Sequence, residues 1–280
     1  MRIAIATYID NNPNLIKEFN WLYRSWLYSG SWTTSRIIAF HHPDVDIKAL
    51  PQESGIVYVP QQPLTGIETE WKDYPFINST YFLTTPEAAE ILSAYEYVLK
   101  TDNDCFLTPN FPALKPRLAM FGIGLYALDP FVAARLIQIA AQWGIQPVSN
   151  NIGSTFLARY SNAMQYAQVH MEYCRKLKRD EFKDGYGAWP GWFFGVLTMY
   201  AGNLAANAVF GAGLTMGGLD VHCMSHDKMC PNDYHIHAFH TYDHFSKFNW
   251  RDGKYRGYDM TSLNKEIISD YCLWIAGCEP

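Results

Sequence analysis

The sequence predicts an α/β protein: one domain on a mostly parallel central sheet, with helices on both faces and a mixed, more irregular C-terminal half. Short apolar runs of strand length alternate with amphipathic helices through the first half of the chain, which is the pattern of parallel βαβ units. The 280 residues are enough for one large hydrophobic core. No linker separates two independent parts of the chain.

The first half alternates predicted strands with predicted helices. Asn12-Pro13 provides a helix start, and Thr85-Pro86-Glu87 provides another, with an acid that faces the positive end of the helix dipole. Apolar residues at helical spacing form one face of the first helix: Leu15, Phe19, Leu22 and Trp26. The predicted strands are residues 3–9, 36–40, 56–59 and 97–101.

The second half contains one long segment without charge. Residues 185–219 hold no Asp, Glu, Lys or Arg, a feature that membrane spans share. Pro190 and several glycines interrupt this run, so we expect a buried central helix and no membrane span. The predicted strands of this half are residues 118–127 and 235–240, and the predicted helices are 130–143, 161–180, 192–208 and 261–276.

Composition excludes several classes of protein. With 49% hydrophobic and 18% charged residues, the chain does not have the composition of a disordered protein. Its net charge of −5 offers no basic excess for duplex nucleic acid, so we expect no nucleic-acid partner. The six cysteines show no Cys-x-x-Cys spacing, and residues 3–9 indicate a strand and not a signal peptide. We therefore expect a cytoplasmic protein.

The most informative segment is Asp102-Asn103-Asp104, which ends a predicted strand. Two carboxylates two residues apart can point the same way and share a hard divalent cation through oxygen ligands. A second Asp-x-Asp, Asp44-Val45-Asp46, lies in a predicted loop and is set aside. The alternative for Asp102 and Asp104 is a polar turn in which they only cap backbone N–H groups. The glycine-rich phosphate loops of dehydrogenases and P-loop proteins do not occur.

With its alternating first half and the strand-terminal Thr101-Asp102-Asn103-Asp104, the chain resembles the GT-A class of nucleotide-sugar glycosyltransferases. The resemblance runs from the first strand to about Lys247. It implies that Asp102 and Asp104 hold Mn²⁺ or Mg²⁺ against the diphosphate of the donor. It also implies a nucleotide sugar and a glycan acceptor as partners, with a UDP-sugar as the expected donor.

The same resemblance implies a division of the chain. A single GT-A domain would cover residues 1–280, with a nucleotide-binding half at 1–110 and an acceptor-side half at 111–280. The chain also resembles the sugar transferases of large algal DNA viruses, including a chlorovirus xylosyltransferase that acts on capsid glycans. This closer resemblance would make UDP-xylose the donor and the host cytoplasm the location.

Donor-binding residues are expected at two places by the same resemblance. Thr7, Tyr8 and Asp10 end the first strand, where GT-A enzymes line the nucleotide pocket; Tyr8 would stack on the base. Asn151 and Gly153 resemble the turn that cradles the donor sugar. An ordinary strand-to-helix turn and a simple loop are the respective alternatives.

A histidine-rich strand late in the chain completes the expected ion site. GT-A enzymes often add a histidine from a late strand as a third metal ligand, and His240 is the first choice, with His237 second. Alternation places these two side chains on opposite faces, so only one of them should bind the ion. Lys247 is the expected contact to the diphosphate.

The catalytic base is less clearly marked. An inverting transferase needs a carboxylate near the acceptor hydroxyl, and the resemblance places it near Trp189 to Trp192, where no acid occurs. Asp184 and Asp220 on either side are the candidates, which leaves both inverting and retaining chemistry open. Trp189 and Trp192 are candidates for a sugar-stacking platform, with core packing as the alternative.

Two other functions remain open from the sequence. Four residues of types that bind zinc lie close together and would suit a zinc-dependent hydrolase: His222, Cys223, His226 and Cys230. Their spacing matches no common structural zinc pattern. A non-catalytic carbohydrate-binding protein that uses exposed tryptophans is the other alternative.

Overall fold

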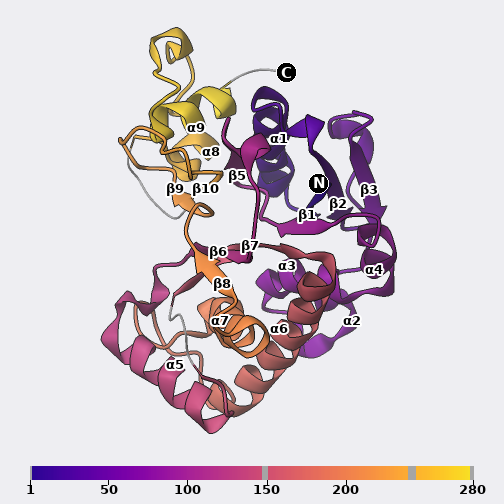
Figure 1. The fold of residues 1–280 in the computed structure, drawn as a ribbon, viewed down its shortest axis with the longest axis vertical. Helices are drawn as coiled ribbons and strands as arrows, with labels where there is room; N and C mark the ends of the chain where they lie inside the picture. The colour runs from indigo at the N-terminus through magenta and orange to yellow at the C-terminus, as the bar shows by residue number, and fades with distance from the viewer. Residues whose placement is uncertain (1, 147–150, 239–243, 278–280) are drawn as a thin grey trace.

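The computed structural model describes residues 2–146, 151–238 and 244–277 of the chain. Its main element is a seven-stranded sheet (Figure 1). The strands are β1 (Ile3–Ile9), β2 (Ser35–His41), β3 (Ile56–Pro60), β4 (Tyr97–Lys100), β6 (Ala119–Ile123), β7 (Ile152–Arg159) and β8 (Leu214–Met216). They lie in the order β3-β2-β1-β4-β7-β6-β8.

The pairing confirms the predicted, mostly parallel sheet. Within the described residues, β1 is parallel to both β2 and β4, β3 is parallel to β2, and β8 is parallel to β6. Among the described strands of this seven-stranded sheet, only β7 runs against its neighbours, β4 and β6. The sheet is therefore mixed through one reversed strand from the second half of the chain.

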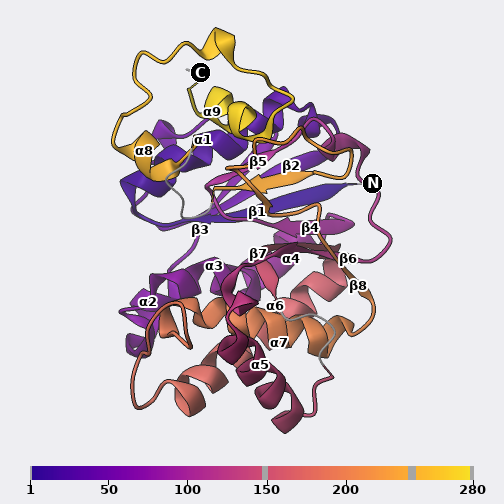
Figure 2. The same ribbon diagram turned by 90° about the vertical axis from the view of Figure 1, so that its left-hand side faces the viewer.

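Helices cover both faces of the sheet, as Figure 2 shows. One face carries α1, α8 and α9, and the other carries the longer helices α5, α6 and α7 together with α2 and α3. The helices are α1 (Pro13–Tyr28), α2 (Leu64–Ile67), α3 (Asn78–Tyr81), α4 (Pro86–Leu92), α5 (Pro130–Gln142), α6 (Tyr160–Glu181), α7 (Leu197–Phe210), α8 (Lys247–Arg251) and α9 (Ile268–Gly277).

The buried strand β1 shows why the sequence folds into layers. All seven of its residues are buried, and their side chains alternate between the two faces. Ile3 and Ile5 pack in the core that contains α1, whereas Ala4 and Ala6 pack in the core that contains α6. At these four positions the smaller side chains of β1 therefore lie on the α6 side and the larger ones on the α1 side.

The predicted helix starts are confirmed. Asn12 accepts a hydrogen bond from the backbone N–H of Asn14 at 2.9 Å and caps α1. Thr85 does the same for the N–H of Ala88 at 3.3 Å and caps α4. These caps satisfy backbone donors that have no partner inside the helix.

A second, three-stranded sheet lies beside the carboxyl end of β4. Its strands are β5 (Cys105–Leu107), β10 (His235–His237) and β9 (Val221–His222), in the order β5-β10-β9. The chain passes from β4 to β5 within four residues, so the Asp-x-Asp segment joins the two sheets. Tyr271 on α9 donates a hydrogen bond to the Leu107 carbonyl at 2.6 Å and fixes this sheet against the C-terminal helix.

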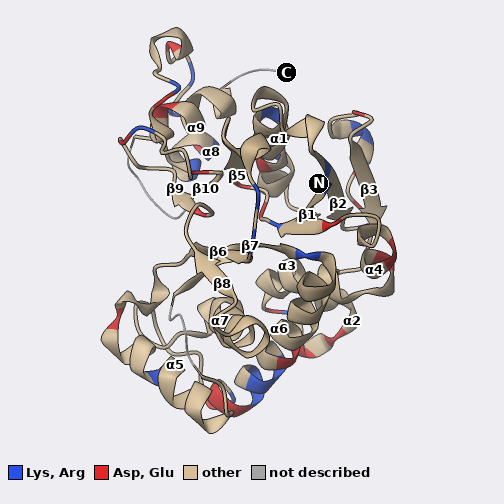
Figure 3. Ribbon diagram, viewed as in Figure 1, with Lys and Arg blue, Asp and Glu red and all other residues tan. Residues whose placement is uncertain are grey.

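Several predicted boundaries change in the structure. The strand predicted at 118–127 is β6 and ends at residue 123, and the helix predicted at 261–276 is α9 and begins at residue 268. The charge-free segment does contain the expected buried helix, α7. In the described ranges, no helix combines the length and the apolar character needed to cross a bilayer. Figure 3 shows acidic and basic segments side by side at the C-terminal end of α6 and around α8.

Candidate functional site

The turn that follows β4 is tied to the end of β1. Asn103 accepts a hydrogen bond from the Thr7 hydroxyl at 2.8 Å and donates one to the Tyr8 carbonyl at 2.9 Å. All three residues are buried. Asn103, the middle residue of the Asp-x-Asp segment, is therefore structural, and it holds the two aspartates at the carboxyl edge of the sheet, where ligands of such sheets bind.

Asp102 and Asp104 have different surroundings. Asp102 is partly exposed and forms an ion pair with Lys100, whose Nζ lies 2.7 Å from its Oδ1. The same ammonium donates to the Ser154 carbonyl at 3.3 Å. Asp104 is only 6% exposed. The first carboxylate therefore faces the solvent side of the site and the second faces its interior.

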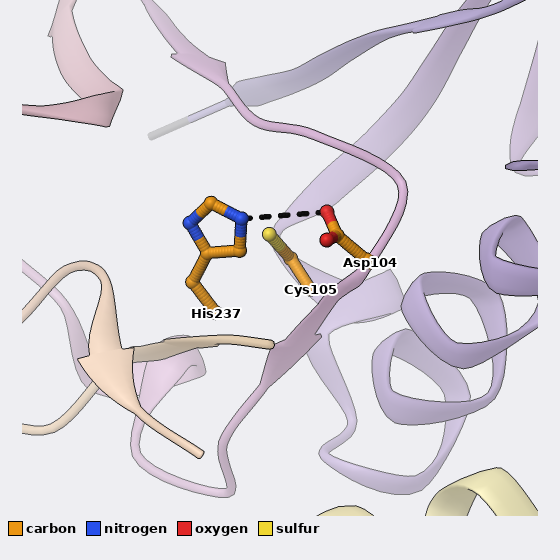
Figure 4. Close-up of side chains that lie close together, drawn as sticks. All are labelled: Asp104, Cys105 and His237. Atoms are coloured by element: carbon orange, nitrogen blue, oxygen red, sulfur yellow. Dashed lines mark ion pairs between the residues drawn. The ribbon is translucent and has the colours of Figure 1, made fainter. Parts of the chain in front are cut away.

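Asp104 contacts two basic side chains from late parts of the chain. Its Oδ2 lies 2.5 Å from Lys247 Nζ, and its Oδ1 lies 3.4 Å from His237 Nε2. Figure 4 shows Asp104, Cys105 and His237 together, with the ion pair as a dashed line. Burial raises the pKa of Asp104, but Lys247 and His237 outweigh this and hold it well below its usual value. Asp104 is therefore ionised in the folded protein.

His237 lies between two carboxylates. Its Nδ1 is 3.4 Å from Asp220 Oδ1, opposite the contact from its Nε2 to Asp104. Burial lowers the pKa of His237, but Asp104 and Asp220 together raise it to about 10. The imidazole is therefore a cation at neutral pH, and it joins two acids from different elements.

Asp220 is the buried end of this network. The residue is 4% exposed, and its Oδ2 accepts a hydrogen bond from the Thr155 N–H at 3.0 Å. Burial raises the pKa of Asp220, but its contacts to His237, His235 and Thr155 lower it to about 2. His235 Nε2 in turn lies 2.8 Å from the Thr101 hydroxyl, beside the Asp-x-Asp segment.

Glu18 and Arg251 extend the charged network toward α1. Arg251, the last residue of α8, donates to Glu18 Oε1 at 2.8 Å. Glu18 is fully buried, and burial together with the nearby Asp104 raises its pKa to about 7. Lys247 begins the same short helix, so α8 presents two cations four residues apart to two acids. We did not predict Glu18 or Arg251, because a charged residue on the apolar side of a helix gives no signal in the sequence.

The expected nucleotide residues lie at the end of β1 as predicted. Tyr8 is buried, its ring stacks on Phe82 with 6.2 Å between centroids, and its hydroxyl donates to the Gln61 carbonyl. Asp10 is partly exposed and accepts a hydrogen bond from the Asn78 side chain at 3.1 Å. Base stacking on Tyr8 remains a prediction, and it would require a change in the Phe82 contact.

The expected sugar-cradling turn lies next to a pocket. Gly153 and Ser154 line a cavity of about 30 Å³ together with Lys100, His170 and Thr198. The Ser154 hydroxyl is buried and has no hydrogen-bond partner in the described part of the chain. The Asn151 side chain accepts a hydrogen bond from the Ala127 N–H at 3.3 Å. The structure thus brings Gly153 close to Lys100, the partner of Asp102.

The other predicted site residues are spread apart. His240 lies outside the described residues, and Asp184 is exposed in the segment that follows α6. Trp189 is 56% exposed, whereas the Trp192 ring is stacked between Phe182 and Tyr200.

The predicted zinc ligands do not form a candidate metal site. In the described ranges, the residues whose ligand atoms all lie within 4.8 Å of one another are Asp104, Cys105 and His237. The set His222, Cys223, His226 and Cys230 is not such a group, and Cys223 is buried while Cys230 is exposed.

The ligand set at Asp104 suits a divalent ion. A buried ionised carboxylate and an imidazole are ligands that Mn²⁺ accepts, and Asp102 adds a second carboxylate at the edge of the site. Burial and nearby acids raise the pKa of Cys105 well above its usual value, so its thiol stays protonated and is a poor ligand for a hard ion. The carboxylate of Asp104 therefore fits the expected ion. His237 fits it only after losing the ring proton that Asp104 and Asp220 hold on it. Asp102 is paired with Lys100 and lies outside the group of clustered ligand atoms.

Comparison with known proteins places the chain in a family. Residues 49–273 match the family described as domain of unknown function DUF7164. The chain belongs to this family. The matched residues make up most of this protein and include the Asp-x-Asp segment, β10 and α8. No curated protein matches the sequence.

A solved structure shares the fold of this DUF7164 chain. The crystal structure of an active-site mutant of LgtC, a GT-A glycosyltransferase, aligns with a TM-score of 0.52. The alignment covers 79% of this chain and 75% of that chain, at 11% sequence identity. The DUF7164 chain therefore has a GT-A-like fold, as the sequence predicted.

Proposed function

We propose that this DUF7164 chain is a metal-dependent glycosyltransferase that moves a sugar from a nucleotide sugar to a glycan acceptor. One observation supports this most directly. At the carboxyl end of β4 in a GT-A-like fold, the carboxylate of Asp104 contacts an imidazole and an ammonium group, from His237 and Lys247. Such a site offers ligands for a divalent ion and a positive charge for a diphosphate.

The side chains have separate proposed roles. Asp102, Asp104 and a histidine hold Mn²⁺ or Mg²⁺. His240 is the first choice from the sequence, and the 3.4 Å contact of His237 with Asp104 supports His237 as the second. The ion supplies Lewis acidity that stabilises the charge of the departing diphosphate. Lys247 adds a second positive charge to the same diphosphate.

The remaining roles concern the donor and the acceptor. Thr7, Tyr8 and Asp10 contact the nucleotide, and Asn151 and Gly153 contact the donor sugar. A UDP-sugar is the proposed donor, with UDP-xylose as the first sugar to test. We propose one domain over residues 1–280, in which residues 1–110 bind the nucleotide and residues 111–280 bind the acceptor.

Two acids remain candidates for the base. Asp220 is buried and paired with His237, so its placement favours a role in orienting that imidazole over contact with an acceptor. Asp184 is exposed and is able to reach an acceptor in solvent. A non-catalytic, carbohydrate-binding protein is the alternative function, and the 56% exposure of Trp189 is the observation that favours it.

Donor hydrolysis tests the proposed function. Purified protein is incubated with UDP-sugars in Mn²⁺, in Mg²⁺ and in EDTA, and released UDP is measured. We expect turnover only with a divalent ion, and a loss of about 100-fold or more in Asp104→Asn. Glycan binding that needs neither nucleotide nor metal would instead favour the carbohydrate-binding alternative.

The chain offers a matched control for this variant. Asp44 belongs to the other Asp-x-Asp segment, its side chain is 74% exposed, and its Oδ2 lies 3.7 Å from His42 Nδ1. Asp44→Asn makes the same chemical change at a surface site, so turnover should stay within about twofold of the wild type. Full metal-dependent turnover in Asp104→Asn would show that the ion site is wrongly assigned.

A further inference from the structure

Lys247 occupies one of the two carboxylate oxygens of Asp104, which leaves less of this acid available to an ion. The Lys247 Nζ atom lies 2.5 Å from Asp104 Oδ2, and both side chains are only 9% exposed. The other oxygen, Oδ1, faces His237 at 3.4 Å. Asp104 is thus neutralised by two cations of the chain itself.

An ammonium and a divalent cation cannot share this oxygen. Like charges a few ångströms apart repel strongly where water is largely excluded. Binding of a metal ion to Asp104 Oδ2 therefore requires Lys247 to move away. A displaced lysine in a buried site also needs a new anion, because a buried and unpaired charge is costly.

A displaced Lys247 would have one acceptor in the chain and a second in the proposed donor. Glu18 Oε2 is buried and has no hydrogen-bond partner in the part of the chain that the structure describes, while Glu18 Oε1 binds Arg251. The charge of Glu18 also raises the pKa of Lys247, so the two groups are close enough to interact. The second acceptor is the diphosphate of a nucleotide donor, which would lie beside the ion.

We propose that Lys247 is a displaceable counter-ion of Asp104, which yields this carboxylate to the metal ion and then binds the donor diphosphate. This inference rests on the proposed function and adds a consequence to it. The ion alone must compete with Lys247 for the Asp104 carboxylate. When the ion and the diphosphate bind together, the carboxylate pairs with the ion and Lys247 pairs with the diphosphate. The two ligands therefore bind cooperatively, and each strengthens the other by the same factor.

The test is Mn²⁺ binding without any donor. Free Mn²⁺ is measured by electron paramagnetic resonance during titration of the wild type and of Lys247→Met. Because the variant has lost the competing ammonium, we expect it to bind Mn²⁺ about tenfold more tightly than the wild type. UDP should strengthen Mn²⁺ binding to the wild type and should do so much less in the variant.

Two further variants show where the effect arises. Lys254→Met makes the same charge change at an exposed lysine in the segment after α8 and should bind Mn²⁺ as the wild type does. The double variant Lys247→Met/Asp104→Asn should not show the tighter Mn²⁺ binding, because that binding depends on the Asp104 carboxylate. Thermal unfolding checks that each protein is folded, and Lys247→Gln replaces Lys247→Met if the methionine variant does not fold.

The outcomes separate the inference from the function. A wild type that binds Mn²⁺ and UDP, together with a folded Lys247 variant that gains no affinity for Mn²⁺, overturns only the inference. A wild type that binds neither Mn²⁺ nor UDP, with no Mn²⁺ binding in the Lys247 variant, overturns the proposed function and the inference with it.

Discussion

The carboxylate of Asp220 occupies the space that a side chain on Gly153 would need. A Cβ atom at Gly153 would lie 2.2 Å from Asp220 Oδ2, and one at Gly122 would lie 2.0 Å from the same oxygen. The N–H of Thr155 donates to this oxygen at 3.0 Å. The antiparallel pair β6 and β7 therefore forms a pocket for one acid, whose other oxygen lies near His237.

Gly153→Ala should disturb this arrangement. The methyl group would collide with a buried carboxylate that is held on several sides, so we expect a loss of about 2 kcal/mol in the free energy of unfolding. Mn²⁺ binding should also weaken, because Asp220 positions His237. Urea denaturation measures the first effect and metal titration the second. Gly185→Ala is the control: no atom lies within 4 Å of its Cβ position, and its stability should not fall.

Asp220→Asn separates charge from backbone conformation. Asp220 has a φ of 52°, which asparagine tolerates better than alanine does. Loss of the buried negative charge beside His237 should cost about 3 kcal/mol of stability at pH 7. Asp220→Ala should cost about 1 kcal/mol more, because alanine is strained at this φ. Equal unfolding midpoints for the two variants would contradict the backbone part of this prediction.

His170 should make stability depend on pH. Burial lowers the pKa of His170 from its ordinary value of 6.5 to about 4. Between pH 4 and pH 6.5 the unfolded chain binds a proton at this residue that the folded chain does not bind. The contribution of His170 to the free energy of unfolding is therefore complete above pH 6.5 and is lost as the pH falls toward 4. The slope from this residue is at most about 1.4 kcal/mol per pH unit.

His170→Gln removes that proton uptake and keeps an N–H donor for the Thr198 carbonyl, which His170 Nε2 contacts at 2.7 Å. Denaturation at pH 7 and at pH 5 should show a smaller difference in the variant than in the wild type. Some dependence on pH remains in both, because burial also lowers the pKa of His235 to about 4. An unchanged difference would mean that His170 titrates normally in the folded protein.

The two tryptophans should respond differently to removal. The Trp192 ring lies 4.2 Å from Tyr200 and 5.6 Å from Phe182, stacked on both, so Trp192→Ala should cost about 3 kcal/mol of stability. Trp189 is exposed, and Trp189→Ala should change stability by less than about 0.5 kcal/mol. If Trp189 stacks on a sugar, its removal should raise the KM for the acceptor. Wild-type kinetics in Trp189→Ala would remove it from the acceptor site.

Strong local signals allowed the first half of the fold to be predicted. The strand at residues 3–9 and the helices that begin after Asn12 and Thr85 each carry an apolar pattern or a cap that acts over a few residues. In contrast, β7 was missed, because residues 152–159 contain Gly153 and Ser154 and become a strand by pairing with β4 and β6. A two-residue strand such as β9 has no sequence pattern of its own and forms only by pairing with β10.

The candidate site was predicted only where its residues carry a local signal. Asp102 and Asp104 stand out because they end a strong strand, and Lys247 was named from the resemblance to GT-A enzymes. The contact between His237 and Asp220, 17 residues apart in the sequence, depends on the pairing of β10 with β9, which Asp220 directly precedes, and could not be derived from either residue alone. The role of Gly122 became visible only once the side chain that fills its space was known.

The joining of two sheets by the Asp-x-Asp turn has a consequence for biosynthesis. Asp104 leaves the ribosome long before His237 and Lys247, and Tyr271, which fixes β5 through the Leu107 carbonyl, follows later still. A nascent chain therefore carries an acidic turn that remains solvated until β10 and α8 have been made. The site takes shape only after these later segments are synthesised, so the first 110 residues released on their own would contain β4 and the Asp-x-Asp turn but not the charged network around Asp104.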